Sequence, residues 1–178
     1  LAMGTFDDVN AISKIAVNTH LAGAAGTVTG AALTRLIGGK TDIVMMLNGA
    51  LAGLVAITAE PLTPGPITAM IIGSIGAVIM YYGTKLLESL GLDDVVGAIP
   101  VHMFAGIFGT LVVPLTNADT SFGTQLIGVI SVCVFSFVLS WITFSTLKST
   151  VGLRISRAAE KQGTDKAEVG VVAYSIRD

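Results

Sequence analysis

The sequence is short of charge. Of its 178 residues only 12% are Asp, Glu, Lys or Arg, while 52% are hydrophobic and the mean hydropathy is +0.80. An ordinary soluble domain carries about 25% charged residues. This composition therefore argues against a water-exposed surface of the usual kind and favours a lipid environment. The net charge of -2 is too small to indicate a nucleic-acid partner.

Cysteine and catalytic motifs are also scarce. The single cysteine, Cys133, excludes a disulfide framework or a zinc-ligand pair within the chain, and its apolar surroundings predict a buried structural thiol. No Gly-rich phosphate loop, Ser/His/Asp set or pair of carboxylates within an apolar run can be assembled. The sequence therefore predicts no enzyme, no metal site and no cofactor. Without an initiator Met or a signal peptide, the start is interpreted as a cut chain.

Five long runs contain no Asp, Glu, Lys or Arg, at residues 15–34, 43–59, 61–84, 95–118 and 120–147. A helix needs about 20 apolar residues to cross the hydrocarbon core. We therefore predict an all-α fold, a polytopic membrane helical bundle of about five transmembrane helices within a transmembrane domain at residues 1–149. Residues 1–10 are expected to form a loop with Asp7 and Asp8 as caps, and the last span to begin near Phe122.

Basic residues predict the orientation. Arg35 and Lys40 lie between the first two runs, Lys85 follows the third, and Arg154 lies beyond the last, whereas Lys14 is the sole basic residue on the other side. The positive-inside rule then places the N-terminus outside and residues 150–178 in a cytoplasmic tail. A short helix is expected in this tail at residues 154–161.

Glycine is plentiful and falls at helical spacings within the runs. In lipid, small side chains let helices approach closely and gain packing contacts. The sequence therefore predicts a compact bundle, with the small residues of its helix faces at Gly23, Gly26, Gly30, Gly49, Gly53, Gly73, Gly76, Gly106 and Gly109.

His102 is the most informative single residue. It lies inside the fourth run, where an ionisable side chain costs several kcal/mol unless it faces protein or water, so it is a functional candidate. The alternative is a histidine that is hydrogen-bonded to a neighbouring helix for packing alone. Pro100 is expected to bend this helix or to mark its first turn. Helical spacing places small residues on the face of His102, which is compatible with a pore wall: Ala98, Ala105, Gly106 and Gly109.

Other polar residues in or beside the runs admit two interpretations. Asp93 and Asp94 precede the helix of His102 and either cap it or belong to a functional site. Asn48 and Thr58 either face water or bond across helices, which is the commoner role. His20, near the outer end of the first run, is expected to be an interfacial or hydrogen-bonded histidine rather than a site.

Three segments resemble the Amt/Mep/Rh family of ammonium transporters. Residues 48–58, NGALAGLVAIT, resemble the opening of the family's eighth helix. Residues 93–102, DDVVGAIPVH, resemble its acidic cap and the second histidine of its pore pair, and residues 151–154, VGLR, resemble the start of its cytoplasmic tail. The resemblance implies an eleven-helix protomer, of which this chain supplies the last five helices, in a homotrimer in the plasma (inner) membrane.

The resemblance also implies a function. Ammonium or ammonia would cross a narrow apolar pore past two hydrogen-bonded imidazoles, one of them His102, with Asn48 and Ala98 along the pathway. Asp94 and Thr58 match vestibule or structural positions. Half of the machinery would precede residue 1, so the chain alone is not expected to transport.

The tail has a regulatory counterpart in the family. Arg154 and Tyr174 match tail positions there, and a PII-type signalling protein is the partner that the resemblance implies. The sequence departs from the family where valines replace polar residues in residues 168–174, EVGVVAY, and where Gly97 replaces a frequent Asp. Two alternatives remain open: an ammonium sensor that signals through a cytoplasmic partner or fused domain, and a structural membrane subunit.

Overall fold

The structure, a computed structural model, describes residues 4–173, and every regular element within them is a helix. The all-α prediction is confirmed. The chain divides into two compact units, Leu1–Ser131 and Val132–Asp178. The elements in chain order are α1 (Phe6–Gly38), α2 (Ile43–Thr58), α3 (Pro66–Ser89), η1 (Ile99–Phe104), α4 (Ala105–Val112), η2 (Val113–Leu115), α5 (Phe122–Thr150), α6 (Arg157–Gln162) and η3 (Asp165–Val169).

The first helix begins earlier than the sequence suggested. Residues 6–10 are helical, so the predicted loop is wrong there, although Asp8 does act in the cap. The Thr5 hydroxyl accepts from the Asp8 backbone N–H at 3.2 Å, and the Asp8 carboxylate accepts from the Thr5 N–H at 3.1 Å. This reciprocal capping box starts a helix in a charged segment. At the other end, Gly39 closes α1 in the left-handed conformation, with φ of 75°.

The breaks between helices follow the sequence closely. α2 ends at Thr58, and α3 begins with Pro66 at its first position, where a proline loses no helical hydrogen bond. The Asp42 carboxylate caps α2 by accepting from the Met45 N–H at 3.0 Å. α5 starts at Phe122, as predicted.

Two helices within residues 4–173, α3 and α5, are long and apolar enough to cross a membrane by length and composition. α2 has 16 residues, which span about 24 Å at 1.5 Å per residue, short of the hydrocarbon thickness of about 30 Å. The stretch Ile99–Leu115 is also a shorter apolar helix. The count of five membrane spans therefore stays a prediction.

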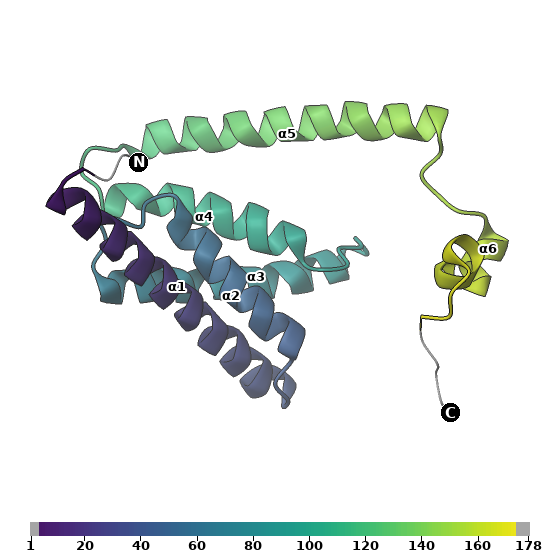
Figure 1. Ribbon diagram of the computed structural model, residues 1–178, viewed down its shortest axis with the longest axis horizontal. Coiled ribbons are helices and arrows are strands. Elements are labelled where there is room, and N and C mark those ends of the chain that lie inside the picture. Colours follow the sequence, from purple (N-terminus) through teal and green to yellow (C-terminus); the bar gives the residue numbers. More distant parts are fainter. Residues whose placement is uncertain (1–3, 174–178) are drawn as a thin grey trace. The chain divides into compact units, whose positions relative to one another are not determined.

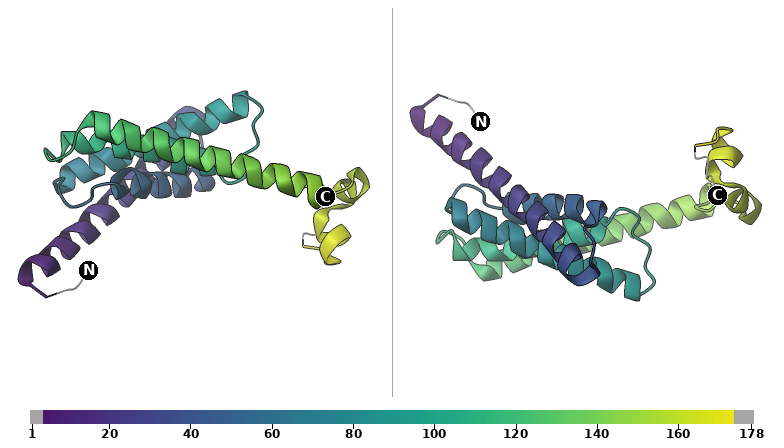
Figure 2. Two further views of the ribbon diagram at one scale, coloured as in Figure 1. Left: turned by 90° about the horizontal axis from the view of Figure 1, so that it is seen from above. Right: turned by 90° about the horizontal axis from the view of Figure 1, so that it is seen from below.

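Helices α1, α2 and α3 pack against one another, and η1 and α4 pack on α2 and α3 (Figures 1 and 2). Glycines set these contacts, as predicted. A Cβ added to Gly49 would lie 2.6 Å from the carbonyl oxygen of Gly26, and one added to Gly26 would overlap the carbonyl oxygen of Gly49. α1 and α2 thus meet backbone to backbone. The same holds for Gly73 of α3 against Ala22 of α1.

A polar network that the sequence did not predict ties α1 to the segments between helices. The Asn18 side chain is fully buried, and its Nδ2 donates to the carbonyl oxygens of Pro61 and Pro64 at 2.8 and 2.9 Å. In the same loop, Glu60 accepts from the Asn117 amide at 3.1 Å. These bonds fix the α2–α3 segment on the bundle and join it to the segment that precedes α5.

The unit Val132–Asp178 holds most of α5 and the tail. α5 has no buried residue within the described chain, and Cys133 is half-buried rather than buried as expected. The tail helix α6 begins at Arg157, after the Ser156 hydroxyl accepts from the Ala159 N–H at 3.2 Å, so the helix is shorter than predicted. Arg154 is exposed in the irregular segment before α6. Tyr174 lies outside the described residues.

The last part of the tail closes on Asp165. Its carboxylate accepts from the Ala173 N–H at 3.0 Å, and its backbone carbonyl accepts from the Val171 N–H at 3.0 Å. Gly170, with φ of 73°, allows the reversal. The hydrogen bond from Ala173 lowers the pKa of Asp165 below its ordinary value of 3.8. The charged carboxylate therefore stabilises the turn at neutral pH.

Acid is expected to open this turn. Because the folded pKa lies below the ordinary value, the contribution is complete above pH 3.8 and is lost as the pH falls through the folded pKa. In the complete protein, the Asp165→Ala variant should exchange the amide hydrogens of Val171 and Ala173 several-fold faster at neutral pH, as measured by hydrogen–deuterium exchange. Glu168→Gln, an exposed change in the same turn, should leave them unchanged. Equal exchange in the Asp165→Ala variant would contradict the assignment.

Candidate functional site

The candidate site begins at a capped turn before η1. The Asp94 carboxylate accepts from the N–H groups of Ala98 and Ile99 at 2.9 and 2.8 Å. Gly97 lies in the left-handed conformation with φ of 75°, and its carbonyl accepts from the Val101 N–H at 3.2 Å. Three of the four N-terminal positions thus have partners for their N–H groups. Asp94 is therefore a cap, one of its two predicted roles.

Pro100 occupies the remaining one of these four positions, between Ile99 and Val101. Since proline has no N–H, it leaves nothing unpaired in a first turn. This confirms the prediction that Pro100 marks the first turn of the helix. η1, which carries His102, is a π-helical turn from Ile99 to Phe104, wider than the α-helix that follows it. Such turns are rare and occur frequently at functional sites.

The π turn changes which residues share a face with His102. Val101 and Ala105 are buried together with Ala52 of α2 and Met80 of α3. A Cβ on Gly109 would overlap the carbonyl oxygen of Ala56. The prediction that Ala105 and Gly109 share the open face of His102 is therefore wrong, because the wider turn rotates the helix and directs them onto α2.

His102 and Ala98 lie on the other side of this segment. Both are exposed, whereas Pro100 and Val101 between them are buried. The segment thus exposes an imidazole and a small side chain, while Pro100 and Val101 pack into the bundle. The other histidine of the chain, His20, is on α1, and its Nδ1 donates to the carbonyl oxygen of Ala16 at 2.7 Å. It is hydrogen-bonded within its own helix, as expected.

The side chains of Asn48 and Thr58 form hydrogen bonds with different partners. Asn48 is 8% exposed, and its Nδ2 donates to the carbonyl oxygen of Val96 at 2.9 Å, across from α2 to the capped turn. Thr58 is exposed, and its hydroxyl donates to the carbonyl oxygen of Leu54 in its own helix at 2.6 Å. Asn48 therefore joins two elements of the site, while Thr58 joins none.

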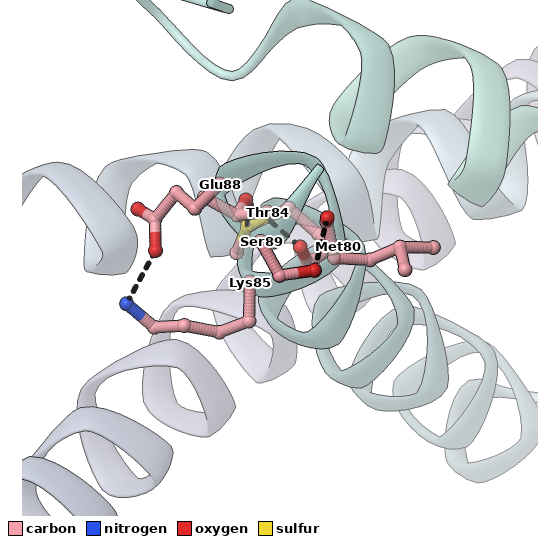
Figure 3. A network of polar contacts seen from close by, with 6 residues as sticks. Met80, Thr84, Lys85, Glu88 and Ser89 are labelled. Atoms are coloured by element: carbon pink, nitrogen blue, oxygen red, sulfur yellow. Dashed lines mark hydrogen bonds and ion pairs between the residues drawn. The ribbon is translucent and has the colours of Figure 1, made fainter. Parts of the chain in front are cut away.

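A cavity of about 250 Å³ lies beside the capped turn. Asp93, Asp94 and Gly97 line it from the turn, and Thr84 and Glu88 line it from the end of α3. Figure 3 shows this end of α3, where Glu88 pairs with Lys85 at 2.9 Å and the Thr84 hydroxyl donates to the carbonyl oxygen of Met80 at 3.0 Å. No group of three or more His, Cys, Asp or Glu side chains suited to a metal ion occurs in the described part of the chain.

Comparison with known proteins decides the family. A sequence model described as the Ammonium Transporter Family matches residues 3–174, nearly the whole chain. The chain belongs to the ammonium transporter family. This confirms the resemblance drawn from the three motifs, and it places the chain among membrane transport proteins rather than enzymes.

Individual relatives in the ammonium transporter family show how much of a whole protein the chain represents. It is 42% identical to "Ammonium transporter Amt2" of Archaeoglobus fulgidus, over 92% of this chain and 39% of that protein. It is 32% identical to "Ammonium transporter" of Corynebacterium glutamicum, over 97% of this chain and 42% of that protein. The chain thus spans about two fifths of the length of these relatives.

Solved structures agree on the fold. A structure named "Sensor Amt Protein" is similar with a TM-score of 0.82 and 31% identity, over 88% of this chain and 42% of that one. Mep2 of Candida albicans is similar with a TM-score of 0.75 and 27% identity, over 88% of this chain and 39% of that one. The membrane helical bundle of the ammonium transporter family is therefore the fold of this chain.

The site combines residues that the sequence identified with one contact that it did not. Asp94, Ala98 and Asn48 take part in hydrogen bonds of the turn before η1, and His102 follows in η1, whereas Thr58 is separate from them. The hydrogen bond from Asn48 to the Val96 carbonyl was missed, because a backbone acceptor leaves no mark in the sequence. Gly97 was the available signal: a glycine directly before a helix often has positive φ and a neighbour that comes close.

Proposed function

We propose that the complete protein carries ammonium or ammonia across the membrane, and that this chain supplies its last five helices. The observation that carries the proposal is the exposed imidazole of His102, held by a π turn on an element whose other side packs into an apolar core. Family membership and the names of the relatives support ammonium as the substrate.

His102 and Ala98 would line the pathway, beside a second histidine contributed by a part of the protein outside this chain. In a pore without water, the imidazole would be a hydrogen-bond partner of the passing ammonia. A neutral ring has one nitrogen that donates and one that accepts, which suits ammonia as it passes. Asp94 would serve the pore by capping the helix of His102, and Thr58 would have a structural role within α2.

The surroundings of the pore are part of the proposal. The protein would be a homotrimer in the plasma membrane, with residues 1–149 in the membrane domain and residues 150–178 in a cytoplasmic tail. Basic residues on one side, Arg35, Lys40 and Lys85, support an outside N-terminus and a cytoplasmic C-terminus. The tail, including Arg154 and Tyr174, would contact a PII-type signalling protein.

Transport is preferred to sensing because the relatives at 42% and 32% identity are named ammonium transporters. The name "Sensor Amt Protein" belongs to one structure of similar fold. Both functions use the same membrane fold, so the two are distinguished by flux across the membrane.

The test uses the complete protein in proteoliposomes. A pulse of ammonium should produce a saturable transient current or a change in internal pH, and equal pulses of sodium or potassium should not. Protein-free liposomes, which show the passive permeation of ammonia, are the control. Binding of ammonium without a flux above that control would contradict transport and support a sensor.

A further inference from the structure

We propose that Asn48 is a positioning residue, which holds the capped turn so that η1 presents His102 to the pathway, and that Asn48 does not itself touch the substrate. The inference rests on the proposed transport function. This role differs from the pathway role that the family resemblance implied for Asn48. It follows from the hydrogen bond that the Asn48 amide makes with the Val96 carbonyl.

The amide of Asn48 is already engaged in a hydrogen bond. Asn48 is 8% exposed, so little of its side chain can reach a pore, and its Nδ2 donates to the carbonyl oxygen of Val96 at 2.9 Å. That carbonyl belongs to a turn rather than to a helix, so the helix ladder offers it no partner. The Asn48 amide is buried, so the loss of this acceptor would leave its N–H group without a partner, which is unfavourable. The bond from α2 is therefore a strong restraint on the turn.

The same amide lies close to Gly97. A Cβ on Gly97 would lie 2.7 Å from Nδ2 of Asn48, and φ of Gly97 is 75°. The amide thus fills the space that a side chain at residue 97 would need, directly before the first helical N–H groups. The Val96 carbonyl is thus held from α2, while the Asp94 carboxylate holds the N–H groups of Ala98 and Ile99.

A buried stretch of chain connects the turn to the His102 imidazole. His102 lies five residues after Gly97, and the intervening Pro100 and Val101 are both less than 2% exposed. Because Val101 packs on α2 and α3, the segment is fixed at its middle, and the hydrogen bond from Asn48 fixes its start. A rotation of the turn would therefore be transmitted to the direction of the His102 ring. Small misplacements of a group that orients a substrate lower rates strongly.

The experiment compares variants of the complete protein in proteoliposomes, with maximal rate, KM and the pH profile of ammonium-driven current as readouts. Asn48→Leu keeps a similar volume and removes the donor, and Asn48→Gln keeps an amide donor. Asn48→Leu should lower the maximal rate about tenfold, equivalent to about 1.4 kcal/mol, leave KM within twofold, and shift the pH profile in the same direction as His102→Ala. Asn48→Gln should recover part of the rate.

The matched control is Thr27→Val, which removes a half-buried polar group that bonds only within its own helix, to the Gly23 carbonyl at 2.9 Å. It should leave all three readouts unchanged. If Asn48→Leu raises KM with the pH profile intact, Asn48 contacts the substrate and the inference is wrong. If Asn48→Leu matches the unaltered protein while His102→Ala does not, Asn48 has no positioning role and the transport proposal stands.

A second variant, Gly97→Ala, tests the inference if the Asn48→Leu protein folds poorly. Gly97→Ala displaces the Asn48 amide from the other side, and it should give the same change in pH profile together with faster hydrogen exchange at the Ala98 and Ile99 amides. Unchanged exchange there would overturn the inference. If His102→Ala itself leaves ammonium flux unchanged, the pore role of His102 fails first, and the positioning role of Asn48 fails with it.

Discussion

Replacement of His102 by Ala in the complete protein is expected to reduce the maximal ammonium-driven current by about tenfold. The imidazole is the one ionisable side chain in residues 95–118, and it is exposed on the side of its segment opposite the apolar packing. In the proposed pathway it would replace water as a hydrogen-bond partner of ammonia, and each such bond contributes about 0.5–1.5 kcal/mol, or up to roughly tenfold in rate. The measurement is current in proteoliposomes that contain equal amounts of folded protein.

His20→Ala is the matched control for this experiment. His20 is the other histidine of the chain, and its ring is exposed and bonded to the Ala16 carbonyl of its own helix. Its removal should leave current and selectivity unchanged. Unaltered current and selectivity in the His102→Ala protein would remove the observation on which the transport mechanism depends.

Replacement of Gly26 by Val is expected to have the largest effect on stability. A Cβ at residue 26 would overlap the Gly49 carbonyl oxygen and lie 3.1 Å from the Cα of Gly53. These neighbours are backbone, so neither can turn aside and the two helices must separate. Overpacking of this kind costs about 1–3 kcal/mol, and the upper part of the range is expected here. The midpoint of thermal unfolding in detergent and the yield of folded protein would measure it.

Gly38→Val on the same helix controls for the change of residue type. Gly38 ends α1, and a Cβ there would meet nothing within 4 Å. Its effect should remain within about 0.5 kcal/mol, as for most surface substitutions. Equal melting midpoints for the two valine variants would mean that α1 and α2 are not in backbone contact in the complete protein.

Much of this fold could be predicted from where charge is absent. Runs without charged residues located the apolar helices, and the start of α5 at Phe122 was predicted. The charge pattern gave a wrong prediction at residues 6–10. Because of Asp7 and Asp8 this segment was predicted as a loop, but it is the start of a helix that Thr5 and Asp8 cap mutually. Charge located the apolar stretches, whereas local hydrogen bonds determined the helix ends.

The candidate site was predicted less completely. His102 was identified because an ionisable group in an apolar run is costly, and Asp94 because an acid before a helix is a cap. The face of His102 was predicted from α-helical spacing, which a π turn does not obey, so Ala105 was placed wrongly. The partner of Asn48 is a backbone carbonyl, and the position of that carbonyl depends on the tertiary fold.

The glycine contacts among α1, α2 and α3 bear on how the protein moves. Where main chains touch, no side chain can change its rotamer to absorb a displacement between helices, and packed protein interiors compress little. These three helices therefore form one rigid body, through the contacts of Gly26 with Gly49 and of Gly73 with Ala22. Any opening or closing in the proposed transport would therefore take place at the edges of that body, in the turn before η1 or in the loops, and not by sliding of one helix past another.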